Sequence, residues 1–420
     1  MIQPLNFISM IVQTYRLRNQ WITQLTRSKA TNNKNLIVLG IETSCDDTGC
    51  GIVDSKGTIL GNALYSQHLL HLKYGGIIPP IAQDLHIKNI TELCECALKS
   101  ANMKLHNVDA VAATVKPGLP LSLSVGRNFG VRLSLIGNKP FIPIHHMEAH
   151  ALVARMTQQV DFPYLVLLIS GGHCLLAIVQ NVSSFFLLGT TIDDAPGEAF
   201  DKIARRLKLK NLIDFSNLNG GQAIEIAASR AESPTQFSFA APLTHSLDCN
   251  FSFSGLKTTA LNYILECERK SSIIGDKVIP NIYNLCASYQ LAITRHICQR
   301  TQRAMEFINR HELLPNDHRT LVISGGVACN DFIFKCLNSV CSEMGFACIR
   351  PPSKLCTDNG LMIAWNGMER LMTNSGILTN KNDIANVDIE KKSPVGKDWT
   401  SRVREENIKC KWIKIKLHKN

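Results

Sequence analysis

Three histidines and a glutamate lie within six residues in the stretch IPIHHMEAHALVAR, residues 142–155. If this stretch is helical, His146 and His150 are one turn apart on one face, so both imidazoles can reach a single metal ion. His145 then points about 100° away around the helix. The pattern predicts either a metal site or a helix start whose histidines are satisfied by caps and solvent, and both interpretations stay open at this point.

The position of Glu148 argues against one familiar kind of metal site. The zinc-protease helix HExxH needs a glutamate directly after its first histidine, and the inverted form HxxEH needs it directly before the second. Here Glu148 stands midway between His146 and His150. A protease would lack its general base, and we find no other motif for peptide cleavage.

A third metal ligand has to come from a distant part of the chain. The stretch KLCTDNGLMIAW, residues 354–365, places Asp358 just before a helical pattern. A carboxylate would complete a His2Asp set, which suits zinc or iron. Asp358 or Thr357 could equally be the N-cap of the following helix. Residue types alone leave the cap and the ligand as alternatives.

Apolar strands separated by glycine-containing turns must position these residues. Residues 36–64 and 164–192 both read as strand, turn, strand, tight turn, strand, and residues 321–330 add another strand and turn. Helical patterns cover residues 81–100, 121–136, 197–207, 282–309 and 359–372. The repetition predicts an α/β fold with a duplicated lobe.

Glycine-containing turns that follow apolar strands offer backbone N–H groups to a phosphate in a cleft between two lobes. The sequence has no GxxxxGK[ST], and no GxGxxG follows a strand, which excludes a P-loop and a dinucleotide-binding fingerprint. The actin-like ATPase (ASKHA) superfamily holds nucleotide by turns of this kind. We therefore predict that fold, with two lobes around a central cleft.

The net charge of +11 lies in the tails. Residues 1–35 carry five Lys or Arg and no acid, with apolar residues at helical spacing, which is typical of a mitochondrial transit peptide. Residues 391–420 carry ten Lys or Arg against three acids, and the alternation in residues 409–419 favours a solvated edge strand over direct RNA contact.

No segment approaches 18 uninterrupted apolar residues, which predicts no membrane span. Fifteen cysteines without a CxxC pair indicate free thiols in a reducing compartment.

These features predict five segments. We expect a leader at 1–34, an N-terminal lobe at 36–157, a C-terminal lobe at 160–350, a metal-ligand loop with a returning helix at 351–376, and a basic C-terminal tail at 377–420.

Several segments together resemble one family, the tRNA N6-adenosine threonylcarbamoyltransferases, once described as O-sialoglycoprotein endopeptidases. The motifs, in chain order, are LGIETSCDDTG, YGGIIP, PGL, IPIHHMEAH, LLISGGH, IDDAPGEAFDKIAR, FSFSGLK, ISGGVACN and CTDNG. They extend from residue 39 to about 372, and the basic leader resembles that of an organellar member. The sequence departs from the family pattern at Asp47, Pro80 and Asp84, which replace Glu, Glu and Arg.

The resemblance implies a site as well as a fold. It implies one divalent metal ion, zinc or iron, held by His146, His150 and Asp358. The substrate-binding positions that it implies are Leu168, Ile169, Ser170, Gly171, Gly172, Asp201, Gly221, Glu225, Cys329, Asn330 and Thr357.

The resemblance further implies transfer of a threonylcarbamoyl group from threonylcarbamoyl-AMP, made by a separate synthase, to N6 of adenosine 37 in tRNAs that read codons beginning with A. We expect metal-assisted acyl transfer without a covalent enzyme intermediate. We expect the reaction to take place in the mitochondrial matrix, and the chain could act there as a homodimer. Two alternatives remain: an ATPase or small-molecule kinase of the actin-like superfamily, and a non-catalytic protein that maintains the mitochondrial genome.

Overall fold

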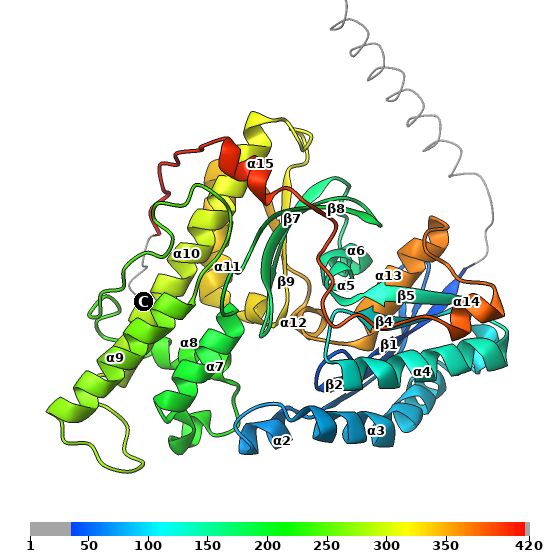
Figure 1. Cartoon of the computed structure of the whole chain (residues 1–420), viewed down its shortest axis with the longest axis horizontal. Helices are drawn as coiled ribbons and strands as arrows, with labels where there is room; N and C mark the ends of the chain where they lie inside the picture. The colour runs from blue at the N-terminus through cyan, green and yellow to red at the C-terminus, as the bar shows by residue number, and fades with distance from the viewer. Residues whose placement is uncertain (1–34, 416–420) are drawn as a thin grey trace, which may run out of the picture. The chain divides into compact units, whose positions relative to one another are not determined.

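The computed structural model describes residues 35–415, so the expected leader at 1–34 and the last five residues lie outside the described chain. Its strands form two sheets (Figure 1). The first sheet contains β1 (Ile37–Glu42), β2 (Asp47–Asp54), β3 (Ile59–Ser66), β4 (Ala110–Lys116) and β5 (Phe141–His145). The second contains β6 (Tyr164–Ile169), β7 (Cys174–Asn181), β8 (Ser184–Thr190), β9 (Thr320–Ser324), β10 (Ala347–Ile349) and β11 (Lys397–Asp398).

Both sheets have the same strand topology. The first has the order β3-β2-β1-β4-β5, and the second has the order β8-β7-β6-β9-β10, with β11 added beside β8. In each sheet the first strand pairs antiparallel with the next and parallel with a strand that follows a helical crossover. The predicted duplication is therefore confirmed, with β1–β3 matching β6–β8.

Helices connect the strands and cover the sheets. They are α2 (His68–Lys73), α3 (Pro79–Ser100), α4 (Pro120–Gly137), α5 (His146–Leu152), α6 (Ala154–Thr157), α7 (Pro196–Arg206), α8 (Gly220–Ser229), α9 (Ser254–Lys270), α10 (Ile282–Arg310), α11 (Asp331–Met344), α12 (Ser353–Cys356), α13 (Gly360–Met372), α14 (Lys381–Ala385) and α15 (Thr400–Glu405). The five helical patterns in the sequence correspond to α3, α4, α7, α10 and α13, each within two residues at either end.

Alternation along β1 shows how the first sheet is buried. Leu39 and Ile41 lie in a core cluster with residues of α3 and α4. Gly40 faces the other way, since a Cβ there would lie 2.1 Å from the backbone nitrogen of Ala364 in α13. The sheet is thus packed between α3 and α4 on one face and α13 on the other, and glycine is required where the α13 backbone comes this close.

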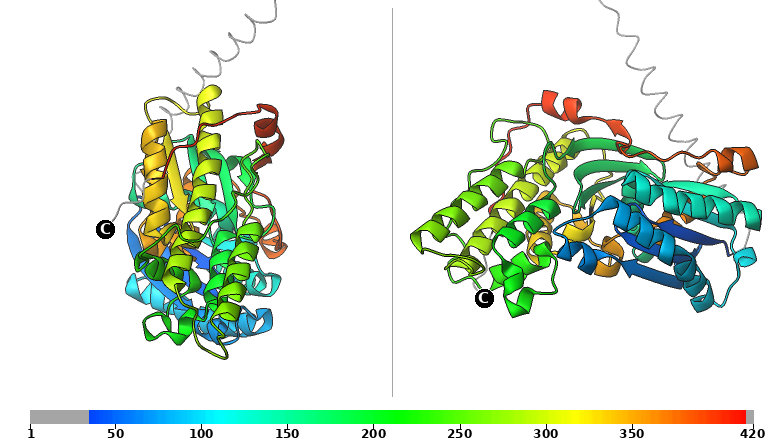
Figure 2. Two further views of the ribbon diagram at one scale, coloured as in Figure 1. Left: turned by 90° about the vertical axis from the view of Figure 1, so that its left-hand side faces the viewer. Right: turned by 60° about the horizontal axis from the view of Figure 1, so that its bottom comes forward.

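The second sheet has its own core. Leu165, Leu167 and Ile169 of β6 belong to a cluster that includes residues of α7, α8, α9, α10 and α11. In this cluster the long helix α10 and α9 lie side by side (Figure 2). The helix α5 packs against β6 and β9 of this sheet and also against α13. It therefore connects the two sheets, and it carries the histidine pair.

The C-terminal segment differs from the sequence prediction. Residues 409–415 form no strand. Instead, Ile413 N donates to Oε1 of Gln302 in α10 (3.0 Å), and Nε2 of Gln302 donates to the Lys411 carbonyl (2.9 Å). The predicted edge strand is wrong over these residues because a side-chain amide of α10 satisfies the backbone groups that a neighbouring strand would have bonded.

None of the helices in the described residues has the length and apolar content that crossing a membrane requires.

Candidate metal centre

The histidine pair lies at the start of α5. β5 ends at His145 and α5 begins at His146, so the chain passes directly from a buried strand into the helix. His146 and His150 are both buried, and their rings meet edge to face with centroids 4.7 Å apart. The two imidazoles therefore share one face of the helix, as the spacing predicts.

Asp358 completes the group from the loop before α13. Its Oδ1 lies 3.0 Å from Nε2 of His150 and 3.5 Å from Nε2 of His146. The N-cap of α13 is Asn359, whose Oδ1 accepts from Met362 N (2.9 Å). The alternative role of Asp358 or Thr357 as this cap is therefore wrong, and the carboxylate of Asp358 is available to a ligand.

The three side chains fit a divalent cation. Their donor atoms all lie within 4.8 Å of one another. Two ligands of a tetrahedral ion bound at about 2.1 Å lie about 3.4 Å apart, which is close to the two carboxylate distances. The two imidazole nitrogens, which lie within 4.8 Å of each other, would move toward the same separation when an ion binds. Two neutral imidazoles with one carboxylate form a donor set that suits zinc or iron.

The electrostatics also favour positive charge at this point. Burial lowers the pKa of His146, but the carboxylates of Asp358 and Glu42 outweigh it and raise the pKa to about 10. Burial opposes ionisation of Asp358 as well, yet His146 and His150 hold its pKa well below the usual range. A metal ion would supply the positive charge that the protonated His146 otherwise supplies.

Glu42 and Ser44 support His146 from the end of β1, and the sequence analysis missed both. Nδ1 of His146 lies 3.3 Å from Oε2 of Glu42 and 3.1 Å from Oγ of Ser44. When Nδ1 carries the proton and donates a hydrogen bond to this carboxylate, Nε2 keeps its lone pair, which is directed at the site. Their only signal in the sequence is polarity at the end of an apolar strand, in GIETS.

The remaining polar residues of the cluster have structural roles. Oε2 of Glu148 accepts from Nη2 of Arg370 in α13 (2.6 Å), away from the histidine pair. Nδ1 of His145 caps α5 by accepting from Met147 N (3.2 Å), and its Nε2 lies 3.2 Å from the Ser393 carbonyl. The cap interpretation therefore holds for His145 alone.

The first glycine turn follows β6. The side chains of Leu168 and Ile169 are buried in the sheet, so these two residues can offer only backbone groups. Ser170 begins the turn, and its carbonyl accepts from Gly197 N (3.1 Å) at the start of α7. A Cβ on Gly171 or Gly172 would meet nothing within 4 Å. The space into which side chains at these two positions would point is therefore open, while the Gly171 carbonyl accepts from Glu198 N (3.2 Å) and so packs the turn against α7.

His173 closes the same turn and was missed as a site residue. Burial and the nearby charges of His146 and His150 lower its pKa to about 4. It is therefore a neutral imidazole close to the metal group, and the GGH sequence after an apolar strand is the signal that could have indicated it.

Asp201 and Gly221 come together at another helix start. Asp201 lies on α7, and backbone groups of Gly220 and Gly221 at the N-terminus of α8 hydrogen-bond to its carboxylate and partly cover it. Burial nevertheless raises its pKa overall. The two predicted residues therefore form one feature, with the carboxylate held at the helix terminus.

Asn330, Glu225 and Cys329 meet at the start of α11, directly after the 3-10 helix η4 (Gly326–Cys329). Oδ1 of the buried Asn330 accepts from Ile333 N (3.0 Å), while its Nδ2 has no hydrogen-bond partner among the described residues. Oε1 of Glu225 accepts from Asp331 N (2.7 Å). Asn330 thus offers an unused donor, whereas Glu225 already stabilises the helix N-terminus.

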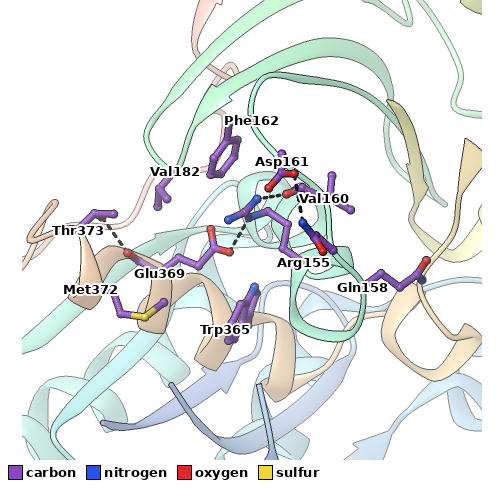
Figure 3. A pocket seen from close by; sticks show the side chains of 11 residues that line it. Arg155, Gln158, Val160, Asp161, Phe162, Val182, Trp365, Glu369, Met372 and Thr373 are labelled. Carbon is purple, nitrogen blue, oxygen red and sulfur yellow. Dashed lines mark hydrogen bonds and ion pairs between the residues drawn. The ribbon is translucent and has the colours of Figure 1, made fainter. Parts of the chain in front are cut away.

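A surface hollow of about 340 Å³ is lined by a different set of residues (Figure 3). Nε of Arg155 in α6 donates to Oε1 of Glu369 in α13 (2.7 Å), and the guanidinium lies over the ring of Phe162. None of the residues lining the hollow belongs to the predicted site. The ion pair ties α6 to α13 and has a structural role.

Two sheets of matching topology and a His2Asp group beside glycine turns define a two-lobe α/β protein of the actin-like class. The crystal structure of T. kodakarensis HypF shares the fold, with a TM-score of 0.51, 13% identity, and coverage of 83% of this chain and 49% of that chain. Residues 58–365 match the sequence profile of the tRNA N6-adenosine threonylcarbamoyltransferases. The chain belongs to this family of transferases.

Individual relatives support this assignment. The "tRNA N6-adenosine threonylcarbamoyltransferase, mitochondrial" of Xenopus tropicalis is 46% identical over 379 residues, which is 90% of this chain and 93% of the relative. The protein of the same name in Homo sapiens is 46% identical and covers 91% of each chain. A bacterial relative from Rickettsia bellii, named without the organelle, is 40% identical and covers 82% of this chain and 96% of its own.

Proposed function

We propose that the chain transfers the threonylcarbamoyl group from threonylcarbamoyl-AMP to N6 of adenosine 37 in tRNAs that read codons beginning with A. The observation that carries the proposal is the meeting of His146, His150 and Asp358 close to His173, which closes the Gly171–Gly172 turn, in a chain of this family. The reaction joins N6 to the carbonyl carbon of the donor, the bond from that carbon to the phosphate oxygen breaks so that AMP leaves, and one of the two N6 protons is released.

His146, His150 and Asp358 would hold one zinc or iron ion. When bound there, a divalent cation supplies Lewis-acid stabilisation of negative charge on the donor's oxygens. Glu42 fixes the ring of His146, since its carboxylate accepts a hydrogen bond from Nδ1–H. The exocyclic amine of adenine is a weak nucleophile because its lone pair is delocalised into the ring, so positioning of both reactants has to contribute much of the rate.

The substrate would lie against the open turns. Backbone N–H groups of Gly171 and Gly172 are suited to the adenylate phosphate, because no side chain blocks them, whereas Ser170 N already donates to the His173 carbonyl (2.9 Å). The unpartnered Nδ2 of Asn330 is a further donor for the nucleotide. Thr357, exposed beside Asp358, would contact the threonyl end. Leu168 and Ile169 would act through the backbone alone.

Adenosine 37 lies in the anticodon loop, where extrusion of a base costs little. The basic residues of the C-terminal tail are suited to the tRNA backbone. The acid-free leader and the mitochondrial names of the animal relatives support import into the mitochondrial matrix.

The direct test is to incubate the purified metal-loaded protein with threonylcarbamoyl-AMP and unmodified tRNA, and to examine the nucleosides by mass spectrometry. We expect threonylcarbamoyladenosine at position 37 and no product from a tRNA with guanosine there. The variant Asp358→Asn keeps the side-chain volume and removes a ligand charge, so it should lose the activity. The matched control Asp317→Asn, at an exposed surface position, should retain it.

Modified nucleoside from Asp358→Asn at the wild-type rate would contradict the proposal. ATP hydrolysis or phosphorylation of a small molecule at enzyme-like rates without tRNA would instead support an actin-like kinase or ATPase.

A further inference from the structure

Two cysteines of the described chain meet beside the metal-ligand loop. Cys329 ends η4 and Cys356 ends α12, and these two short helices pack directly against each other. Sγ of the half-buried Cys329 lies 3.7 Å from the carbonyl of Ser353, the first residue of α12. The thiol of Cys356 is buried and interacts directly with that of Cys329. Cys329 and Cys356 are 27 positions apart in the sequence, and the fold places them in contact.

The surroundings of Cys329 favour its thiolate. Hydrogen bonding to Cys356 and to Ser353, together with the charge of Arg350, lowers its pKa below the usual range although burial opposes this. The guanidinium of Arg350 is fixed nearby, since Nη1 donates to the Ala328 carbonyl (3.1 Å). A partly exposed cysteine with thiolate character and a second thiol beside it has the features of a peroxide-sensitive pair.

The loop between Cys356 and α13 has little slack. Asp358 follows Cys356 by two residues, and Nδ2 of Asn359 donates to the Thr357 carbonyl (2.7 Å). The start of α13 cannot slide, because a Cβ on Gly360 would already lie 2.4 Å from Gly51 N in the first sheet. A displacement of Cys356 must therefore be taken up by Thr357 and Asp358.

We propose that Cys329 and Cys356 form a reversible disulfide in response to a hydroperoxide, and that this bond weakens metal binding by displacing Asp358. This inference rests on the proposed function, because it assumes that Asp358 is a metal ligand. An S–S bond of about 2.05 Å is shorter than any contact between two thiols, so its formation pulls α12 toward η4.

The chemistry balances with hydrogen peroxide as the oxidant. The Cys329 thiolate attacks one peroxide oxygen, the O–O bond breaks, hydroxide leaves, and a sulfenic acid forms. The sulfur of Cys356 then attacks the sulfenic sulfur, a second hydroxide leaves, and the disulfide forms. The two thiol protons neutralise the hydroxides, so two thiols and one peroxide give one disulfide and two waters. A dithiol reductant reverses the step.

The experiment uses the full chain loaded with Zn²⁺, which does not itself react with peroxide by electron transfer. Cys96 is exposed, so Cys96→Ser serves as the background that removes an adventitious thiol. After one equivalent of hydrogen peroxide, alkylation and peptide mass spectrometry should find one Cys329–Cys356 disulfide. Competition with a chromophoric chelator should show zinc affinity reduced at least tenfold, and dithiothreitol should restore it.

Variants in the same background identify the pair that is responsible. The zinc affinity of Cys356→Ser after peroxide treatment should stay within twofold of its affinity before treatment. The matched control Cys348→Ser removes one member of another interacting pair, Cys341 and Cys348, and should still lose affinity like the background protein.

Two results would overturn the inference: both thiols remaining reduced after peroxide, or a mapped disulfide with unchanged zinc affinity. Transferase activity of the reduced protein is measured separately. Its absence would count against the proposed function, whereas disulfide mapping and zinc affinity still decide on the switch.

Discussion

Glu42 and His146 are 104 residues apart in the sequence, and their side chains meet 3.3 Å apart behind the candidate metal centre. The carboxylate is fully buried, and its Oε1 also accepts from Ser44 N (2.6 Å). A buried carboxylate is costly unless it is paired, and here the pairing with His146 offsets that cost. The same pairing orients the histidine ring. The end of β1 therefore belongs to the site as much as α5 does.

Replacement of Glu42 should weaken metal binding without removing a ligand. Glu42→Gln keeps a hydrogen-bond acceptor but loses the charge that stabilises the His146 proton, so we expect zinc affinity to fall about 10- to 100-fold. Chelator competition measures this. Glu390→Gln, which removes a carboxylate from an exposed pair with Lys116, is the control and should bind like the wild type. Equal affinities for the two variants would contradict the supporting role.

Gly172 and Gly360 differ in their surroundings: a side chain would meet nothing at the first and would meet the backbone of a neighbouring strand at the second. Gly172→Ala adds a methyl group where nothing lies within 4 Å, so the free energy of unfolding should change by less than about 0.5 kcal/mol while KM for threonylcarbamoyl-AMP rises about tenfold. Gly360→Ala places its Cβ 2.4 Å from backbone and should destabilise the fold strongly. Urea unfolding and steady-state kinetics measure the two effects. An unaltered KM for Gly172→Ala would show that substrate does not lie against this turn.

Glu148 should contribute to stability and not to metal binding. Its pair with Arg370 joins α5 to α13, and both side chains are 12% exposed. Glu148→Ala removes the only carboxylate paired with this guanidinium among the described residues and leaves its bond to Asn366, so we expect a loss of about 1–3 kcal/mol in the free energy of unfolding. Zinc affinity of the folded variant should stay within twofold of the wild type. A collapse of zinc affinity at unchanged stability would contradict the structural role.

His296 makes stability depend on pH in a defined window. Its Nε2 accepts from Ser252 N (3.0 Å), and burial together with the charge of Arg300 lowers its pKa to about 3. Because this value lies below the unfolded value of about 6.5, the unfolded chain binds the proton first, and stability present above pH 6.5 is lost as the pH falls.

Between pH 6.5 and 5.0 the wild type should therefore lose about 1.5 kcal/mol more than His296→Gln, whose amide oxygen can still accept the bond but does not titrate. Urea unfolding at each pH measures the difference. Parallel curves for the two proteins would show that His296 does not remain neutral in the folded state.

Local patterns explain what the sequence could predict. The helical spacing of apolar residues located α3, α4, α7, α10 and α13, because burial on one face of a helix is visible within a few turns. The duplicated strand units were likewise visible, since both repeat the same alternation of strand and turn. The spacing of His146 and His150 sets their common face in the same way.

Contacts between distant segments account for what the sequence could not predict. Nothing near Glu42 indicates His146, and nothing near Cys329 indicates Cys356, because only the folded sheets bring them together. The cap of α13 is Asn359, one residue beyond Asp358 and two beyond Thr357, the two cap candidates weighed from the sequence, and all three residue types are good N-caps. The expected strand at 409–415 failed because alternation specifies a face but not the partner that satisfies the backbone.

Anomalous diffraction from crystals of the zinc-loaded protein tests the central claim most directly. A single peak at the zinc edge, about 2.0–2.2 Å from Nε2 of His146, Nε2 of His150 and a carboxylate oxygen of Asp358, is the result that we predict. A zinc-loaded crystal with no peak among these three residues, or with its peak on cysteine sulfurs elsewhere, would contradict the metal centre and the function built on it.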